Sequence, residues 1–462
     1  MPFIPHTDDD VRAMLKSIGA PSIDALFDEI EPALKTSQFA GIAEGVDEMT
    51  MLVEMGERAR RDEVGPCFTG AGCYDHHIPA AVWDIAGRGE FMTAYTPYQA
   101  EASQGTLQLI YEYQTMITAL TAMDVSNASV YDGGSALGEA VLMAVRANRA
   151  HPSSRTGELR RVVVAGACHP HYVDTAANMT RNQGIEVVSA ETMDGRIDLD
   201  VLAGMAHERA PVAVVVQQPN FFGLIEPVDG VVDWARDNGA LVVAVVNPTS
   251  LALLKPPGKW GANGADIVCG DGQPLGIPMA SGGPSFGFLC TRQSLVRQLP
   301  GRLVGRTVDR DNQPGFTLTL QAREQHIRRG KARSNICTNQ GLLVTAATIY
   351  LAIVGAMGLK QVASRCHERT RELVDALTVV KGVRSHFAGG FFHEHVIDVG
   401  QPADRVADAV AELGIIAGLP LGRYSSDLGS DLRNCLLVCA TEKRTDADIA
   451  RFGDALQQVL HG

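Results

Sequence analysis

The 462-residue sequence is short of positive charge, and it lacks the features that mark several large classes of protein. Its 40 lysine and arginine residues are outnumbered by 53 aspartate and glutamate residues, which gives a formal net charge of −13. Because a nucleic-acid-binding surface normally needs clustered basic residues, this balance argues against nucleic acid as a partner. The nine cysteines form no Cys-x-x-Cys pair, and we expect reduced, mostly buried thiols and no structural zinc site.

The sequence also shows no obvious targeting segment. The first ten residues, MPFIPHTDDD, are acidic and lack the basic and apolar regions of a secretory signal. We find no run of the roughly 20 apolar residues that a membrane span requires. These observations predict a cytoplasmic protein that has no membrane partner.

Short β-branched runs that alternate with helical segments dominate the middle of the chain. The predicted strands cover residues 161–165, 187–188, 212–216, 241–246 and 267–268. Such runs are typical of strands buried on both faces, which indicates an α/β fold with a mostly parallel sheet. We predict a helical N-terminal arm over residues 1–42, a large α/β domain over 43–329 and a smaller α/β domain over 330–462. The smaller domain should contain helices near 341–357 and 446–460 and strands near 391–399 and 436–440.

Residues 93–107, TAYTPYQAEASQGTL, form the most distinctive segment. Tyr95 and Tyr98 flank Pro97, whose ring fixes its own φ and pushes Thr96 into an extended conformation. Tyrosines on a rigid segment can form a pocket wall and donate hydrogen bonds, although an ordinary surface loop explains the same residues equally well.

A second candidate is the run from Asp132 to Ala136, DGGSA, which leads into a predicted helix. Free backbone N–H groups at a helix start attract phosphate, so Gly133, Gly134 and Ser135 are candidate ligands. A glycine-containing turn with a serine N-cap is an equally good interpretation.

Residues 101–144 resemble the P-protein of the glycine cleavage system, the pyridoxal-phosphate-dependent glycine decarboxylase family. The resemblance extends through GAGCYDHHIP at 70–79, LKPPGKWGANG at 254–264, QAREQHIRR at 321–329 and SNICTNQ at 334–340, and thus spans nearly the whole chain. Family members are either one chain of two homologous halves or a pair of subunits. The length and details of this chain resemble subunit 1, the N-terminal-half type. The resemblance implies the fold of the pyridoxal-phosphate-dependent transferases, fold type I.

The resemblance also implies where a cofactor site would lie in this chain. His169 matches the residue that stacks on the cofactor ring, and with Gly133, Gly134 and Ser135 it forms a predicted vestigial site. Asn247 stands where the family has an aspartate that keeps the pyridine nitrogen protonated, and an amide carries no charge for that task. Pro274 follows Gln273 where the catalytic half has a His-Lys pair, and proline cannot form a Schiff base.

The function implied by the resemblance is therefore shared between two subunits. A partner, P-protein subunit 2, would bind pyridoxal phosphate covalently, and the expected assembly is an α2β2 heterotetramer. The assembly would decarboxylate glycine and pass the aminomethyl group to the lipoyl arm of the H-protein, and the isolated chain would be inactive. Tyr95, Thr96, Tyr98 and Gln104 are the candidates for the wall of the shared site.

Two alternatives to this function stay open. The chain could be a non-catalytic scaffold or regulatory partner, or an independent pyridoxal-phosphate enzyme that recruits Lys255 or Lys259. The charged residues Arg323, Glu324 and His326 are interpreted as a helix surface or packing strut and not as catalysts.

The pair His76-His77 is not expected to bind a metal. Consecutive histidines point in different directions on regular structure, and no carboxylate lies at a ligand spacing in the sequence. Hydrogen bonding in a loop before Pro79 is the favoured role.

Overall fold

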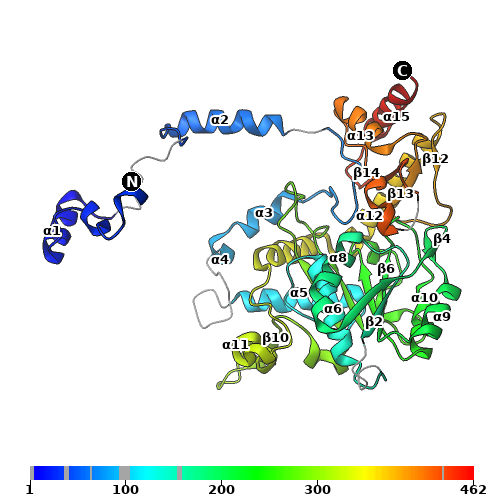
Figure 1. The fold of residues 1–462 in the computed structure, drawn as a ribbon, viewed down its shortest axis with the longest axis horizontal. Helices are drawn as coiled ribbons and strands as arrows, with labels where there is room; N and C mark the ends of the chain where they lie inside the picture. The colour runs from blue at the N-terminus through cyan, green and yellow to red at the C-terminus, as the bar shows by residue number, and fades with distance from the viewer. Residues whose placement is uncertain (1–4, 36–40, 63–64, 93–104, 153–158, 429–430) are drawn as a thin grey trace. The chain divides into compact units, whose positions relative to one another are not determined.

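The computed structural model describes residues 5–35, 41–62, 65–92, 105–152, 159–428 and 431–462 (Figure 1). The chain forms two compact units, Met1–Glu63 and Val64–Gly462. The three-part division made from the sequence, with boundaries after residues 42 and 329, stays a prediction.

The first unit consists of short helical segments. They are α1 (Asp8–Ile18), the 3-10 turns η1 (Asp24–Phe27) and η2 (Pro32–Leu34), and α2 (Glu48–Arg61). Helix α1 starts at a capping box, in which the Thr7 side chain accepts from the Asp10 N–H, and it ends at Gly19 with φ 71°. None of the described residues in this unit is buried, so these residues form no hydrophobic core of their own.

The second unit is built on a seven-stranded sheet of order β1-β9-β8-β7-β6-β2-β3. Strands β3, β2, β6, β7 and β8 are parallel, as predicted, whereas β9 and β1 extend the sheet in antiparallel fashion. The bounds are β1 (Val125–Ser126), β2 (Arg160–Ala165), β3 (Ile185–Ser189), β6 (Ala213–Gln218), β7 (Leu241–Val246), β8 (Ile267–Asp271) and β9 (Gly287–Thr291). The predicted mostly parallel α/β fold is therefore confirmed.

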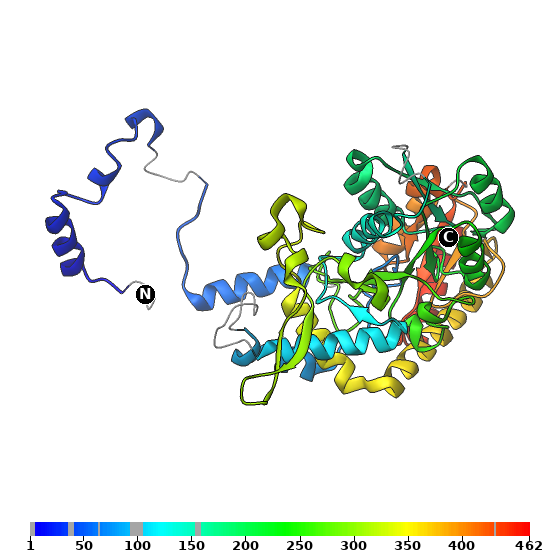
Figure 2. The same ribbon diagram turned by 90° about the horizontal axis from the view of Figure 1, so that it is seen from below.

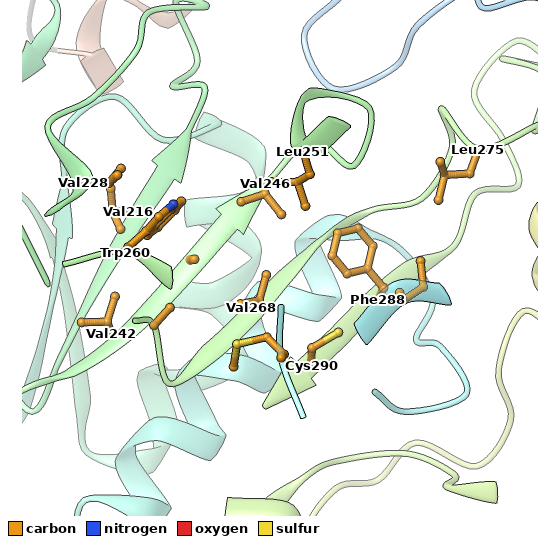
Figure 3. Packing of buried hydrophobic residues seen from close by; sticks show 14 of the residues in the cluster. Val216, Val228, Val242, Val246, Leu251, Trp260, Val268, Leu275, Phe288 and Cys290 are labelled. Atoms are coloured by element: carbon orange, nitrogen blue, oxygen red, sulfur yellow. The ribbon is translucent and has the colours of Figure 1, made fainter. Parts of the chain in front are cut away.

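Both faces of this sheet are buried, and successive residues alternate between two cores. Val214 and Val216 of β6 lie in one hydrophobic cluster, whereas Ala213 and Val215 lie in the other. Figure 3 shows part of the first cluster, with the fully buried Trp260 among the strand valines. This alternation explains why the strands read as continuous apolar runs.

Helices cover the sheet on each side. Side chains of α6 (Gly133–Ala147) and α8 (Pro170–Thr180) belong to the second cluster. The first cluster takes side chains from α3 (Ala80–Ala86), α5 (Thr106–Thr121), α9 (Leu199–Glu208), α10 (Val228–Asp237) and α12 (Gly341–Thr378). In Figure 2 the cyan α5 and the yellow start of α12 run side by side.

Helix α12 corrects one expectation from the sequence. By length and composition it is apolar enough to cross a membrane, because threonines, glycines and one tyrosine interrupt the apolar run without adding charge. A core helix meets the same criteria, and Leu343, Val344 and Tyr350 lie in the first hydrophobic cluster. The helix is broken at Gly355, where φ is 61°.

The C-terminal part forms a second, antiparallel sheet of order β12-β13-β15-β14. Its strands are β12 (Arg384–Ser385), β13 (Glu394–Asp398), β14 (Leu419–Pro420) and β15 (Cys435–Cys439), and it packs with α13 (Ala403–Glu412), α15 (Asp446–His461) and the second half of α12. The two C-terminal strands and two helices predicted from the sequence are confirmed. All nine cysteines are free, and seven of them are buried.

The remaining elements are short. They are the hairpins β10 (Val304–Val308) with β11 (Pro314–Leu318) and β4 (Thr192–Met193) with β5 (Arg196–Ile197), the helices α4 (Gly89–Met92), α11 (Gln325–Arg328) and α14 (Ser425–Leu428), and several 3-10 turns.

Candidate functional site

Three residues that the sequence marked as cofactor positions line one small cavity. His169 follows β2, Asn247 follows β7 and Pro274 follows β8, so all three lie beyond the carboxyl ends of parallel strands. This end of the sheet is where α/β proteins usually bind ligands. The cavity measures only about 30 Å³, which leaves room for no more than a water or two.

The Tyr172 ring fills the space beside His169. The two rings are stacked, with centroids 4.5 Å apart and an interplanar angle of 12°. The His169 Nε2 lies 2.9 Å from the Ala71 carbonyl oxygen and therefore carries the proton that it donates. Burial lowers the pKa of His169 to about 4, so the imidazole is neutral, and Tyr172 from the first turn of α8 covers one of its faces.

The start of α6 binds carboxylates of the chain itself. The Gly133 N–H donates to Asp271 at 3.0 Å, and the Ser135 N–H donates to Asp132 at 2.7 Å in a capping box. Both carboxylates also line an adjoining, more open cavity of about 530 Å³. A phosphate at this helix start would have to compete with two anionic groups that already satisfy its N–H groups.

The positions of the missing acid and lysine are filled by neutral groups. The Asn247 amide lies 3.1 Å from the Nε2 of His393, to which it donates. Burial lowers the pKa of His393 well below the usual value, so this ring is neutral too. No lysine is among the described residues that line the cavity, and Lys255 instead forms an ion pair with Asp229 at 2.9 Å.

The Gln273 side chain anchors a loop across the cavity. Its amide accepts from the Tyr74 N–H at 2.8 Å and donates to the carbonyl oxygens of Tyr74 and Ile277 at 2.9 and 2.7 Å. Glu394 holds the same loop, since its carboxylate accepts from the Ala71 N–H at 2.5 Å and from the Tyr74 hydroxyl at 2.8 Å. Both ends of the Gln273 amide are thus used, and Gly72 and Tyr74 of this loop line the cavity together with His393 and Glu394.

This arrangement does not fit pyridoxal phosphate. Tyr172 stacks on one face of His169, and the helix start at the phosphate position faces the carboxylates of Asp132 and Asp271. Pro274 offers no amine for a covalent bond. What the site can do is position the loop from Gly72 to Tyr74 rigidly against the end of the sheet.

Sequence reasoning missed Tyr172, Asp271, His393 and Glu394. One signal was available for Tyr172, which lies three residues after His169 at the start of α8, so that the two side chains share one helix face. No such signal existed for Glu394, because it meets Tyr74 across 320 residues of chain.

Other predicted residues lie elsewhere. Tyr95, Thr96, Tyr98 and Gln104 lie outside the described residues. Arg323 is buried and donates to the Leu299 carbonyl oxygen, and Glu324 is buried in an ion pair with Arg302. His326 lies near the same carboxylate, at 4.0 Å. These contacts support the interpretation of the segment as a packing strut.

The family model and the sequence relatives that match this chain all point to the same protein family. The family model described as glycine cleavage system P-protein matches residues 1–456. The protein named probable glycine dehydrogenase (decarboxylating) subunit 1 from Legionella pneumophila strain Lens is 56% identical over 100% of this chain and 99% of its own. The protein of the same name from Alcanivorax borkumensis is 54% identical, with both chains covered completely.

Solved structures agree with this result. The crystal structure of glycine decarboxylase (P-protein) of the glycine cleavage system, in inhibitor-bound form, has a TM-score of 0.86 and 39% identity, and the match covers 99% of this chain and 100% of that one. A sphingosine-1-phosphate lyase from Burkholderia pseudomallei matches with a TM-score of 0.61 over 92% of this chain and 93% of its own. At 16% identity, that match shows the fold alone.

Proposed function

Because the chain belongs to the glycine cleavage system P-protein family, we propose that it is the subunit of a glycine decarboxylase that completes the active site of a lysine-bearing partner. In this proposal, the assembled enzyme decarboxylates glycine and transfers the aminomethyl group to the lipoyl arm of the H-protein. The partner, subunit 2, binds pyridoxal phosphate covalently, the assembly is an α2β2 heterotetramer, and it works in the cytoplasm. The isolated chain is inactive.

One observation supports the assignment of the Schiff-base lysine to the partner subunit and not to this chain. The position that would hold the Schiff-base lysine is Pro274, which lines the small cavity and offers no amine for a covalent bond. The name subunit 1, which the relatives bear, supports the existence of a second subunit. The proposed wall of the shared site consists of Tyr95, Thr96, Tyr98 and Gln104, on the strength of the family resemblance.

The first experiment measures absorption spectra with added pyridoxal phosphate, before and after borohydride, for the chain alone and mixed with the lysine-bearing subunit. We expect a reducible band and glycine-dependent CO2 exchange only in the mixture. A reducible band from the chain alone would show an independent enzyme. The ion pair of Lys255 with Asp229 argues against that result.

The second experiment separates a shared site from a scaffold. Tyr95→Phe and Tyr98→Phe each remove one hydroxyl group, and we expect a loss of turnover of at least about tenfold, equivalent to 1.4 kcal/mol, with normal assembly. Tyr111→Phe on α5 removes a hydroxyl outside both cavities and serves as the control. Full turnover in both variants would favour the scaffold.

A further inference from the structure

A cluster that the proposed function does not use lies between α12 and the C-terminal sheet. It consists of His76, Cys366 and Glu442, whose nearest nitrogen, sulfur and oxygen atoms all lie within 4.8 Å of one another. His76 follows the loop that Gln273 anchors, Cys366 lies on α12, and Glu442 follows β15. His76 and Cys366 are buried, and the Glu442 side chain is 13% exposed.

Chain topology assembles this cluster from distant parts of the sequence. Glu442 meets the Nδ1 of His76 at 2.8 Å across 366 residues and the sulfur of Cys366 at 3.1 Å. The expectation of no metal at His76 considered only ligand spacings along the sequence, and such spacings do not record this contact. His77, in contrast, is exposed, and only its backbone N–H contacts Glu442.

The separations between these three atoms lie within about half an ångström of those around a tetrahedral metal ion. Zinc bonds of about 2.0 Å to nitrogen and oxygen and about 2.3 Å to sulfur place neighbouring ligand atoms about 3.3 to 3.5 Å apart. The observed separations are 2.8 Å from His76 to Glu442, 3.1 Å from Cys366 to Glu442 and 3.9 Å from Cys366 to His76. Shifts of about half an ångström would bring all three to ligand positions.

We propose that His76, Cys366 and Glu442 form a binding site for one divalent transition-metal ion of the zinc class. Thiolate and imidazole ligands favour zinc and its soft neighbours over magnesium and calcium, which prefer oxygen. The fourth position is taken by water, which reaches the site beside the partly exposed Glu442.

The surrounding structure holds the carboxylate in place. The His77 N–H donates to Glu442 Oε1 at 2.7 Å, which leaves Oε2 directed at His76 and Cys366. Hydrogen bonds of this kind to a ligand carboxylate orient it toward the metal.

When one metal ion binds, the site releases one proton to solvent. Without metal, the Cys366 thiol and the His76 Nδ1–H both donate to Oε2 of Glu442. On binding, the thiol proton leaves to solvent and the imidazole proton moves to Nε2, so that sulfur and Nδ1 each present a lone pair to the ion. The ion then cross-links a loop, a helix and a strand end that lie far apart in the sequence.

Cobalt substitution and metal content test this site in the full chain, purified with a reductant and without chelator. We expect about one zinc per chain after gel filtration, and a near-ultraviolet thiolate-to-cobalt band on titration with Co²⁺. Cys366→Ala should abolish both. Cys439→Ala, which alters another buried cysteine nearby on β15, should leave both unchanged.

The site would be refuted by wild-type protein that retains no zinc, by a cobalt complex without the thiolate band, or by equal zinc in both variants. Glu442→Gln, which keeps the size of the side chain, should lower zinc affinity at least about tenfold. If Cys366→Ala does not fold, the wild-type cobalt spectrum together with Glu442→Gln decides the question. At one fixed zinc concentration, zinc should also raise the Tm of the wild type and of Cys439→Ala by more than that of Glu442→Gln.

Discussion

Replacing Glu394 with glutamine tests how the anchored loop is held. Glu394 is the first residue of β13 and is 5% exposed. Its carboxylate accepts from the Ala71 N–H and from the Tyr74 hydroxyl. Glutamine has the same shape, can accept from Ala71, and can donate to the Tyr74 oxygen. The change therefore removes a charge and keeps the packing.

The expected size of the effect follows from the pKa of this carboxyl. Burial raises the pKa of Glu394 from 4.5 to about 7, with the hydrogen bonds from Ala71 and Tyr74 opposing that rise. The folded state thus holds the proton more tightly than the unfolded state. The stabilisation from this proton is complete below pH 4.5 and is lost as the pH rises through about 7. Between pH 5 and 8 the loss is about 2.5 kcal/mol.

The assay is urea unfolding of the full chain at several pH values between 5 and 8. Because glutamine does not titrate, the free energy of unfolding of Glu394→Gln should rise relative to wild type by about 2.5 kcal/mol over this range. Glu412→Gln alters an exposed carboxyl at the end of α13, and its free energy of unfolding should show the same pH dependence as that of wild type. Equal pH profiles for wild type and Glu394→Gln would show that Glu394 does not carry the raised pKa.

Three further substitutions test the filled cavity. Gly133→Ala places a methyl group 2.8 Å or less from the Tyr172 ring. The variant should lower the free energy of unfolding by about 2 kcal/mol in a urea titration. Wild-type stability would show that the stack of Tyr172 with His169 moves freely. Asp271→Asn removes a carboxylate at the start of α6, so calorimetry should find inorganic phosphate bound about tenfold more tightly, and unchanged binding would refute the competition argument. Gln273→Leu removes the side-chain partner of the Tyr74 N–H and of the Tyr74 carbonyl oxygen. The variant should destabilise the chain by about 3 kcal/mol and speed hydrogen exchange at the Tyr74 N–H. A wild-type exchange rate at this N–H would contradict the anchoring role.

The sheet was predictable because its physical signal is local. Strands β2, β6, β7 and β8 are apolar runs with side chains buried on both faces, and such runs stand out in a sequence. Strand β9 was missed because the preceding residues, SGGPS, indicate a turn, and because it pairs antiparallel with β1 and β8 in a sheet that was expected to be mostly parallel. Helix α12 was predicted too short, since its second half carries charged residues that weaken the apolar pattern.

The candidate site was predictable only in part, for a different reason. His169, Asn247 and Pro274 each follow a strand, so strand ends and the family resemblance together located them. The residues that fill the site come from other parts of the fold, and their roles depend on contacts between distant segments. Glu394 reaches Tyr74 across 320 positions, a separation that no periodicity or motif records.

The filling of the small cavity by Tyr172 bears on the evolution of this chain. A mutation that restored lysine at position 274 would supply an amine, but Tyr172 would still occupy the ring position and Asp271 the helix start. Asn247 would still lack the charge that the cofactor nitrogen requires. Each reversal alone brings no gain in activity, so selection cannot favour the changes one at a time. Under the proposed function, cofactor chemistry could therefore return to this chain only through several simultaneous changes.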